Sequence, residues 1–368
     1  MSEQHAFIPL SFQRLSSDEQ AARLHGFNQT LHDEVRPTGE PVNLEVVREA
    51  VRTAGAAPSG ANFQPWQYVV ITDPGVKRAI REAAAPDSNL LEEAPCLIAV
   101  FRVNYGFLPS GKRIKHYYVH ESTGLSISFL LAALRHAGVS ARLHAPVAAL
   151  GSILKRPRNE TPVVLVTVGG GGSREAASAF YQRMRTRRVI REFSDEPVPA
   201  ELVQEVIAAA EAAPTPAGVK TWRFELISDP ALRRQIRELA EQEEKLFYET
   251  RITPEWREAL APLGTDWEKP FLEVAPHLIA CFKVDQRPKL AFTMESAAIA
   301  TGFVIAALHH AGLSCLTHTP SPMNFLRKAL GRPANETPFL LLPVGYPAEG
   351  CRVPNITRKP LEQILTIM

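Results

Sequence analysis

The feature that most constrains the fold is an internal repeat that spans most of the 368-residue chain. Four segments of the first half return in the same order in the second half, and chance is a poor explanation for four ordered matches. The period is far longer than the roughly 20–50 residues of a solenoid repeat, so the pattern predicts a tandem pair of domains. The matching pairs are LEVVREAVRTAGAAP and ELVQEVIAAAEAAP, EEAPCLIAVFRV and EVAPHLIACFKV, FLLAALRHAG and FVIAALHHAG, and RPRNETPVVLVTVGG and RPANETPFLLLPVGY.

Each copy has the pattern of a helix, a proline-bounded turn, a strand, a helix, a strand, a long helix and two strands. Helical periodicity alternates with short apolar runs such as CLIAVF and VVLVTV, which are typical of buried strands. We therefore predict an α+β or α/β fold in which the sheet of each domain is covered by helices. The expected boundaries are an N-terminal extension at 1–36, a first domain at 37–170, a Gly-rich linker at 171–182 and a second domain at 183–368.

Composition excludes several classes of protein. Apolar residues make up 45% and charged residues 22% of the chain, and the net charge of +2 is too small to indicate a nucleic-acid partner. We find no signal-peptide pattern and no apolar run of membrane-spanning length, so we expect a cytoplasmic protein without a membrane partner. The cysteines form no C-x-x-C pair and lie in or beside apolar runs, so we expect buried thiols and no metal site. They are Cys96, Cys281, Cys315 and Cys351.

The two copies differ at one short turn. The first copy has APSGANFQPW at Ala57–Trp66, whereas the second has APTPAGVKTW at Ala213–Trp222. Pro216 removes a backbone N–H donor and restricts the conformation of Thr215. The turn of the second copy is therefore expected to have lost a function that the first copy keeps.

The second copy also carries an insertion. It has 54 positions from Trp222 to Pro276, against 29 from Trp66 to Pro95 in the first copy. Long insertions over a scaffold are often lids or binding loops, and we expect a lid at about 240–270. Its charged residues have two readings. One is a clamp for a zwitterion and the other is a solvated helix face, since residues four apart share a face. The clamp would consist of Glu244, Tyr248 and Lys269.

Three further patterns are weak when taken alone. Arg187 and Arg188 suit phosphate because arginine presents several donors in a fixed fork, yet they also fit a solvated basic patch. Arg358 near the C-terminus has the same two readings. Thr317 and Thr319 alternate along a strand, which places both hydroxyls on one face, as ordinary strand threonines also do.

Taken together, these motifs resemble the flavin-dependent nitroreductase superfamily and, within it, the iodotyrosine deiodinases. The similarity covers RRVIREFSDEPVP, the lid, THTP, GRPANETPFLLLPVGYP and TRKPLEQI in the second copy. The first copy is similar from about residue 40 to residue 169, including RTAGAAPSGANFQPWQYVV, GKRIKHYY and LLAALRHAG. The resemblance implies an α+β fold of two tandem nitroreductase-like domains, each with a central mixed sheet flanked by helices, which together form an intramolecular pseudo-dimer. In the family the FMN sites lie at a homodimer interface, each built from both subunits.

The residues that the family uses for FMN are divided between the copies. The first copy lacks the arginine pair and has Asp33 and Glu34 near that place, where they would repel a phosphate. Two departures from the family pattern are Val189, where serine is frequent, and His318 between the threonines. The resemblance therefore implies a monomer that mimics a homodimer and has one working FMN site. The implied FMN-binding residues are Pro58, Ser59, Gly60, Asn62, Arg187, Arg188, Val189, Arg191, Thr317, His318, Thr319 and Arg358.

The resemblance also implies a reaction, which is the reductive dehalogenation of halotyrosine-like aromatic amino acids. The backbone N–H of Ala61 would bind the substrate phenolate, and the lid residues Glu244, Tyr248 and Lys269 would bind its zwitterionic end. Thr319 would place a hydroxyl near flavin N5 and favour one-electron steps. The electrons would come from NAD(P)H or from a separate flavin reductase.

Two other functions remain open at this point. The first is another FMN-dependent reaction, such as that of a nitroreductase, an ene-reductase or a dehydrogenase of an amino-acid derivative. The second is a non-catalytic flavin-binding protein, which the loss of one site makes conceivable.

Overall fold

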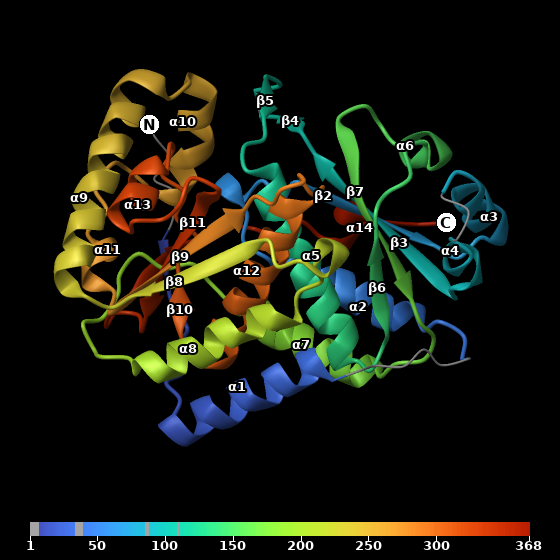
Figure 1. Ribbon diagram of the computed structural model, residues 1–368, viewed down its shortest axis with the longest axis horizontal. Helices are drawn as coiled ribbons and strands as arrows, with labels where there is room; N and C mark the ends of the chain where they lie inside the picture. Colours follow the sequence, from blue (N-terminus) through green and yellow to red (C-terminus); the bar gives the residue numbers. More distant parts are fainter. Residues whose placement is uncertain (1–6, 34–39, 85–87, 109) are drawn as a thin grey trace. The chain divides into compact units, whose positions relative to one another are not determined.

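The structure is a computed structural model that describes residues 7–33, 40–84, 88–108 and 110–368. The chain divides into two compact units by its internal contacts. The first-copy unit contains Gln29–Thr186 together with Arg358–Met368. The second-copy unit contains Arg187–Thr357 together with the chain up to Asn28. Figure 1 labels the helices and strands of both units.

The first-copy unit has a five-stranded sheet in the order β13-β2-β3-β7-β6. Its apolar runs form the strands because both faces of the sheet are covered. Neighbouring strands are antiparallel, except that the short β13 pairs with β2 in parallel. The mixed sheet matches the prediction. The strands are β2 (Trp66–Ile71), β3 (Cys96–Val103), β6 (Ala141–His144), β7 (Glu160–Val168) and β13 (Leu365–Ile367).

Helices cover both faces of this sheet. On one face, α3, α4 and α6 contribute to a buried cluster with alternate residues of β2 and β3. On the other face, α5 contacts the strands and α2 packs on α5. A hairpin of β4 (Tyr105–Phe107) and β5 (Arg113–Lys115) precedes α5. The helices are α2 (Leu44–Ala54), α3 (Pro74–Glu82), α4 (Leu90–Glu93), α5 (Val119–His136), α6 (Leu150–Ile153), α7 (Arg174–Met184) and α14 (Leu361–Ile364).

The second-copy unit has a four-stranded antiparallel sheet in the order β10-β11-β9-β8. This is the order of the equivalent strands β6, β7, β3 and β2 in the first-copy unit, so the sequence repeat is also a repeat of topology. A separate pair is formed by β1 and β12. The strands are β1 (Phe7–Pro9), β8 (Trp222–Ile227), β9 (His277–Val284), β10 (Ser314–Cys315), β11 (Glu336–Gly345) and β12 (Arg352–Pro354).

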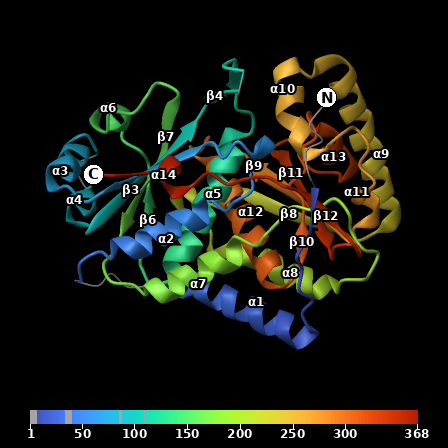
Figure 2. The ribbon, with the colours of Figure 1, turned by 180° about the vertical axis from the view of Figure 1, so that it is seen from behind.

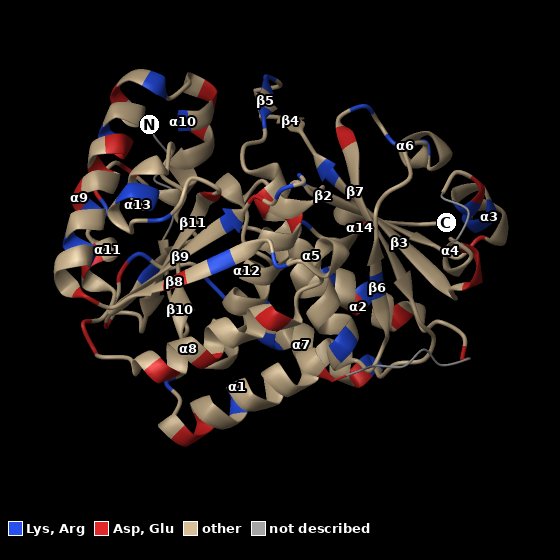
Figure 3. Cartoon of the chain, in the orientation of Figure 1, with Lys and Arg blue, Asp and Glu red and all other residues tan. Residues whose placement is uncertain are grey.

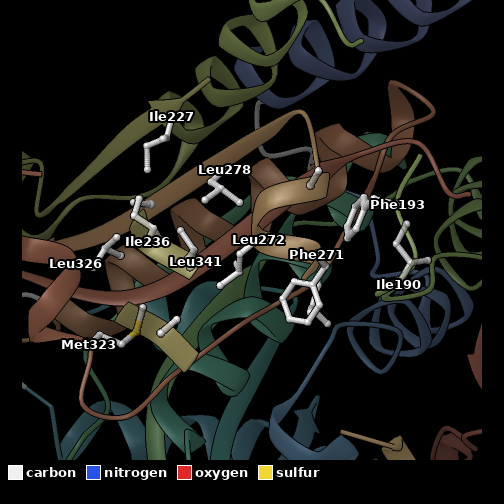
Figure 4. Packing of buried hydrophobic residues seen from close by; sticks show 14 of the residues in the cluster. Ile190, Phe193, Ile227, Ile236, Phe271, Leu272, Leu278, Met323, Leu326 and Leu341 are labelled. Carbon is white, nitrogen blue, oxygen red and sulfur yellow. The ribbon is translucent and has the colours of Figure 1, made fainter. Parts of the chain in front are cut away.

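The core of the second-copy unit lies between this sheet and a layer of three helices, α9, α11 and α13. Figure 4 shows Ile236, Leu272, Leu278 and Leu341 gathered in it. The opposite face of the sheet contacts the buried α12. The helices are α1 (Ser17–His32), which the unit boundary divides, α8 (Ala200–Ala208), α9 (Pro230–Leu246), α10 (Pro254–Leu260), α11 (Phe271–Val274), α12 (Thr293–His310) and α13 (Asn324–Ala329).

The insertion of the second copy consists of the end of α9, a π-helical turn at Phe247–Arg251, α10 and the loop that follows. The helix α9 begins where Asp229 accepts a hydrogen bond from the N–H of Leu232 at 2.7 Å and Pro230 occupies the first turn. Positively and negatively charged residues both occur along α9, which carries blue and red segments in Figure 3. Such a helix keeps a polar face toward solvent while Ile236 and Ala240 are buried.

The structure differs from the expected boundaries in two ways. The predicted linker at 171–182 is largely helix α7, because Ser173 caps its start and Ala177, Phe180 and Met184 are buried. The terminal segments belong to units other than those expected. Residues 358–368 join the first-copy unit through β13, near α3 and α4 in Figure 2, and residues up to 28 join the second-copy unit through β1. The Gly, Ser and Ala composition suggested a flexible linker, but helix α7 packs on α2 and α5.

The structure also bears on the expectations about the cysteines and about membrane-spanning helices. All four cysteines are free and buried, as predicted. Within the described ranges, no helix has the length and apolar character that crossing a bilayer requires.

Candidate functional site

The Ser-Gly turn of the first copy has an unusual backbone. Ser59 precedes a single 3-10 turn at Gly60–Asn62, and Ala61 within it has φ 46° and ψ 25°. The N–H of Gly60 donates to the hydroxyl of Ser122 at 3.2 Å, and the Ser59 hydroxyl accepts from the N–H of Gln64 at 3.0 Å. A Cβ added at Gly60 would lie 3.0 Å from Cδ2 of Tyr118. The turn therefore needs a small residue at this position, as in the sequence motif.

The turn of the second copy keeps the backbone shape but not the donor. Ala217 has φ 51° and ψ 30°, close to the values of its counterpart Ala61. Pro216 offers no N–H to the serine of the following long helix. That serine, Ser296, donates instead to the carbonyl of Pro214 at 2.9 Å. The chemical change from Gly60 to Pro216 thus redirects one hydrogen bond without remodelling the loop.

Arg358 lies in the same unit as the Ser-Gly turn, although we assigned it to the second domain. Its guanidinium donates to the carbonyl of Arg185 at the end of α7, where the helix dipole favours a cation. The next residue, Lys359, donates from its N–H to Oε1 of Gln64 at 2.8 Å and from Nζ to the Gln64 carbonyl at 3.0 Å. The C-terminal segment therefore contacts the segment that ends the turn.

The arginines of the second copy lie beside strand β10. Val189 forms a parallel β-bridge with Cys315, which aligns residues 187–191 with the strand that leads to Thr317. Arg187 is 6% exposed, and burial lowers its pKa to about 10, with a further contribution from Arg188. Burial also lowers the pKa of Arg191. The arrangement concentrates positive charge along one strand of the second-copy unit.

Strand β10 ends at Cys315, so Thr317 and Thr319 lie just beyond it rather than within a strand. Both are half-buried, whereas the residues between and beside them, Leu316, His318 and Pro320, are buried. The backbone of His318 pairs with Leu341. Its ring packs edge-on against Phe271 with centroids 5.5 Å apart. Burial lowers the pKa of His318 well below its ordinary value, and the cations of Lys269 and Arg191 lower it further, so the imidazole is neutral at neutral pH.

The structure brings together the three residues of the predicted clamp. The ammonium of Lys269 lies 3.6 Å from Oε2 of Glu244 and 5.7 Å from the centre of the Tyr248 ring. The same ammonium donates to the carbonyl of Asp266, and the Tyr248 hydroxyl donates to the Thr265 carbonyl at 3.3 Å. These residues form an enclosed polar cluster rather than a solvated face, because the Lys269 and Glu244 side chains are only 3% and 12% exposed.

Burial dominates the ionisation of this cluster. It raises the pKa of the Glu244 carboxyl, while the charge of Lys269 opposes that shift. It lowers the pKa of Lys269, which the carboxylates of Glu244 and Asp266 oppose. It also raises the pKa of Tyr248. Both members of the ion pair are therefore less stable as charges than in water, and a ligand with complementary charges offsets that cost.

Sequence reasoning missed three residues that support these groups. They are Asp266, whose carbonyl accepts from Lys269, and the pair of Gln64 and Lys359 beside the Ser-Gly turn. The motif QPW after the turn and the motif TRKP around Arg358 contain two of them, but their pairing is a long-range contact. Glu34, which we expected to repel phosphate, lies outside the described residues, and Asp33 ends the described segment at the end of α1.

The profile of the nitroreductase family matches residues 38–95 and 184–346, which is more than half of the chain. Three related proteins are named iodotyrosine deiodinase. The one from Haliscomenobacter hydrossis is 48% identical over 198 residues, covering 52% of this chain and 89% of that protein. The one from Nematostella vectensis is 41% identical, covering 53% and 76%. The one from Rattus norvegicus, iodotyrosine deiodinase 1, is 42% identical, covering 52% and 70%.

Solved structures also resemble parts of the chain. An iodotyrosine deiodinase bound to FMN and 3-iodo-L-tyrosine is 30% identical with a TM-score of 0.44, covering 49% of this chain and 95% of that one. A nitroreductase from Bacteroides fragilis with bound FMN is 19% identical with a TM-score of 0.37, covering 48% and 93%. The profile match and the sequence relatives lead to one conclusion: this chain belongs to the nitroreductase family.

Proposed function

We propose that the protein is an FMN-dependent oxidoreductase that removes halogen reductively from halotyrosine-like aromatic amino acids. The observation that carries this proposal is the enclosed cluster of Glu244, Tyr248 and Lys269 in the lid. The cluster lies within residues 184–346, which the nitroreductase profile matches. About half of the chain is similar to relatives that are named iodotyrosine deiodinase. The cluster also argues against a generalist nitroreductase, because nitroaromatic compounds have no zwitterionic end for it to bind.

The residues of the second-copy unit fit a flavin phosphate. A dianion opposes the two effects that lower the pKa of Arg187, its burial and the neighbouring Arg188. We propose that Arg187, Arg188 and Arg191 bind the phosphate end of FMN. Val189 and the segment after β10, with Thr317, His318 and Thr319, complete this part of the proposed site. Pro58, Ser59, Gly60, Asn62 and Arg358 are the proposed contribution of the first-copy unit.

The substrate residues have distinct tasks in this proposal. Glu244 accepts hydrogen bonds from the ammonium of the amino acid, and Tyr248 and Lys269 donate to its carboxylate. The backbone N–H of Ala61 donates to the phenolate oxygen. The lid excludes water, which strengthens each of these interactions.

The chemistry then replaces a carbon–halogen bond by a carbon–hydrogen bond. FMN, once reduced by the external donor, would supply two electrons; with one proton added at the ring carbon, halide would leave. Thr319 provides a hydroxyl that we propose donates to the flavin. Lys269 and Glu244 hold the substrate in place during the reaction.

The test is to supply the FMN-loaded protein with a chemical reductant and either 3-iodotyrosine or a nitroaromatic compound. We expect iodide release from the former and little turnover of the latter. Turnover of the nitro compound alone would reject the proposal, and tight FMN binding without turnover of either compound would favour a flavin-binding protein. The electron donor in the cell, NAD(P)H or a separate reductase, is distinguished by repeating the assay with NAD(P)H alone.

We further propose one FMN per chain, as expected for a monomer that replaces a homodimer. The loss of Gly60's counterpart to Pro216 and the insertion in one copy support a single working site. The flavin content of purified protein, measured from its absorbance, tests this count. The cytoplasmic location also stays a proposal, and the four free thiols are compatible with it.

A further inference from the structure

The segment Ser59–Gln64 carries more backbone strain than its neighbours. Ala61, Asn62 and Gln64 have φ values of 46°, 57° and 48°. Residues with a Cβ rarely adopt this left-handed region, and three of them within four positions persist only where the surroundings hold them.

Lys359 supplies such a constraint from the C-terminal segment. It forms two hydrogen bonds with Gln64: its backbone N–H donates to the side-chain Oε1 at 2.8 Å, and its Nζ donates to the backbone carbonyl at 3.0 Å. Gln64 is 3% exposed, and its Nε2 donates to the carbonyl of Asn62 at 3.3 Å. We call this pair, Gln64 with Lys359, the clasp.

The turn that the clasp adjoins leaves one donor available. Among the described residues, the N–H of Ala61 has no hydrogen-bond partner. The N–H groups on either side are all used. Those of Gly60, Asn62 and Phe63 donate to Ser122 Oγ at 3.2 Å, Ser59 O at 3.1 Å and Gly60 O at 3.1 Å.

The second copy provides an internal comparison. Lys220 stands where the first copy has Gln64, and it is not among the described residues with positive φ. It is exposed and forms an ion pair with Glu211 instead. The clasp thus accompanies the turn that keeps the Ser-Gly motif and not the turn that has lost it.

We propose that Lys359 and Gln64 are positioning residues that fix the strained turn so that the Ala61 N–H stays directed at the phenol oxygen of the substrate. This inference rests on the proposed function and adds to it a source of selectivity for phenols. The clasp touches the turn and not the reacting atoms, so it acts through Ala61. The C-terminal segment that carries Arg358 thereby also sets the shape of the substrate-binding turn.

The experiment compares the affinities of FMN-loaded protein for 3-iodotyrosine and for 3-iodophenylalanine, which lacks the phenol oxygen. Quenching of flavin fluorescence gives both dissociation constants. We expect Lys359→Met to reduce the preference for iodotyrosine about tenfold, the effect of losing one hydrogen bond to a charged group. Lys359→Arg, which keeps a cationic donor, restores part of it. Lys289→Met makes the same chemical change at an exposed lysine and leaves the preference unchanged.

A second measurement does not depend on the substrate. Hydrogen exchange in the FMN-loaded protein reports the amides of residues 59–66, and we expect Lys359→Met to accelerate their exchange about tenfold. Wild-type protein that shows no preference for iodotyrosine would count against the proposed function, while exchange would still decide the clasp.

The clasp proposal is overturned if Lys359→Met keeps both the wild-type preference and the wild-type exchange. It is also overturned if the variant folds but releases FMN, because the lysine would then serve cofactor retention. If Lys359→Met fails to fold, Gln64→Leu removes the other hydrogen bond of the clasp, from the Lys359 N–H to Oε1, and the same two measurements are made on that variant.

Discussion

At the scale of single residues, two effects act in opposite directions on the polar cluster of Glu244, Tyr248 and Lys269. Burial disfavours the charged forms of Glu244 and Lys269, whereas the charge of each favours that of the other. Lys269 is 2% exposed, and its ammonium lies 3.6 Å from the carboxylate of Glu244. Removing one partner of a buried pair leaves an uncompensated charge, which is costly. A zwitterionic ligand brings one opposite charge to each member. These charges therefore support the proposal that the cluster binds an amino acid.

The first prediction concerns these two residues. Lys269→Ala or Glu244→Ala should weaken binding of a halotyrosine by about ten- to a hundredfold, because a hydrogen bond to a charged group contributes roughly 1.5–3 kcal/mol. FMN should stay bound, as measured by its absorbance after gel filtration. Lys245→Ala, on the same helix, is the control. Loss of flavin in either variant would show that the clamp is misassigned.

The second prediction concerns pH. Burial lowers the pKa of His318 in the folded state well below 6.5, the ordinary value that the unfolded chain keeps. At a pH between the folded and the unfolded pKa, the unfolded chain therefore binds a proton that the folded chain does not. Stability contributed by neutral His318 is therefore complete above about pH 6.5 and falls on acidification, by up to about 1.4 kcal/mol per pH unit. His318→Leu should reduce this dependence in urea unfolding between pH 7.5 and 5.5. His25→Leu, at an exposed position, reports the effect of the substitution itself; equal slopes in wild type and His318→Leu would contradict the assignment.

At the scale of elements, two short segments depend on their immediate surroundings: the turn at Gly60–Asn62 and the insertion that begins at the end of α9. The turn at Gly60–Asn62 depends on a glycine because the Tyr118 side chain and the Tyr117 carbonyl lie at 3.0 and 3.3 Å from the place of a Cβ. The predicted lid begins with the end of α9, which is followed by a π-helical turn that carries Tyr248. Such turns are rare and occur often at functional sites. Gly264 in the following loop lies against Phe7, so the N-terminal strand β1 supports the lid loop.

The third prediction compares two glycines. Gly60→Ala should destabilise the protein by about 1–3 kcal/mol, because the added methyl group forces its neighbours to shift. It should also weaken FMN binding. Gly26→Ala in α1 meets nothing within 4 Å and should stabilise by about 0.5–1 kcal/mol, since alanine favours a helix. Urea unfolding measures both; a neutral Gly60→Ala would show that the turn tolerates a side chain.

At the scale of the whole molecule, each unit is completed by a terminal segment from the other end of the chain. In the second-copy unit, β1 pairs with β12, and Nε2 of Gln20 donates to the carbonyl of Ala311 at 2.8 Å. In the first-copy unit, β13 pairs with β2. The two copies are therefore not independent modules along the sequence.

The fourth prediction follows from this exchange. A fragment of residues 183–368, the second domain as the sequence suggested it, lacks β1 and the first part of α1 and leaves β13 without β2. It should unfold at a lower urea concentration than the full chain or precipitate, because it exposes a strand edge and apolar surface. Circular dichroism in a urea titration is the measurement. A fragment as stable as the full chain would mean that the exchanged segments contribute little.

Several features of the fold could be predicted from local patterns of the sequence. The repeat and its alternating elements predicted sheets covered by helices, because periodicity reports which face of each element is buried. The sheet of the first-copy unit is mixed, as the family resemblance implied, whereas the sheet of the second-copy unit is antiparallel. Pro216 predicted the lost donor in the second turn, since proline has no N–H in any fold. The spacing of Glu244 and Tyr248 placed both on one helix face. The predicted roles of these residues in binding stay predictions.

Only the tertiary structure decided the features that depend on contacts between distant segments. Glycine, serine and alanine at 171–182 suggested a linker, yet burial of Phe180 and Met184 makes helix α7 there. No local pattern indicates that β13 joins the sheet of β2 or that Lys359 contacts Gln64, 295 positions away. Such pairings are selected by the burial and hydrogen bonding that the assembled unit makes available, and these energies exist only once the chain has folded.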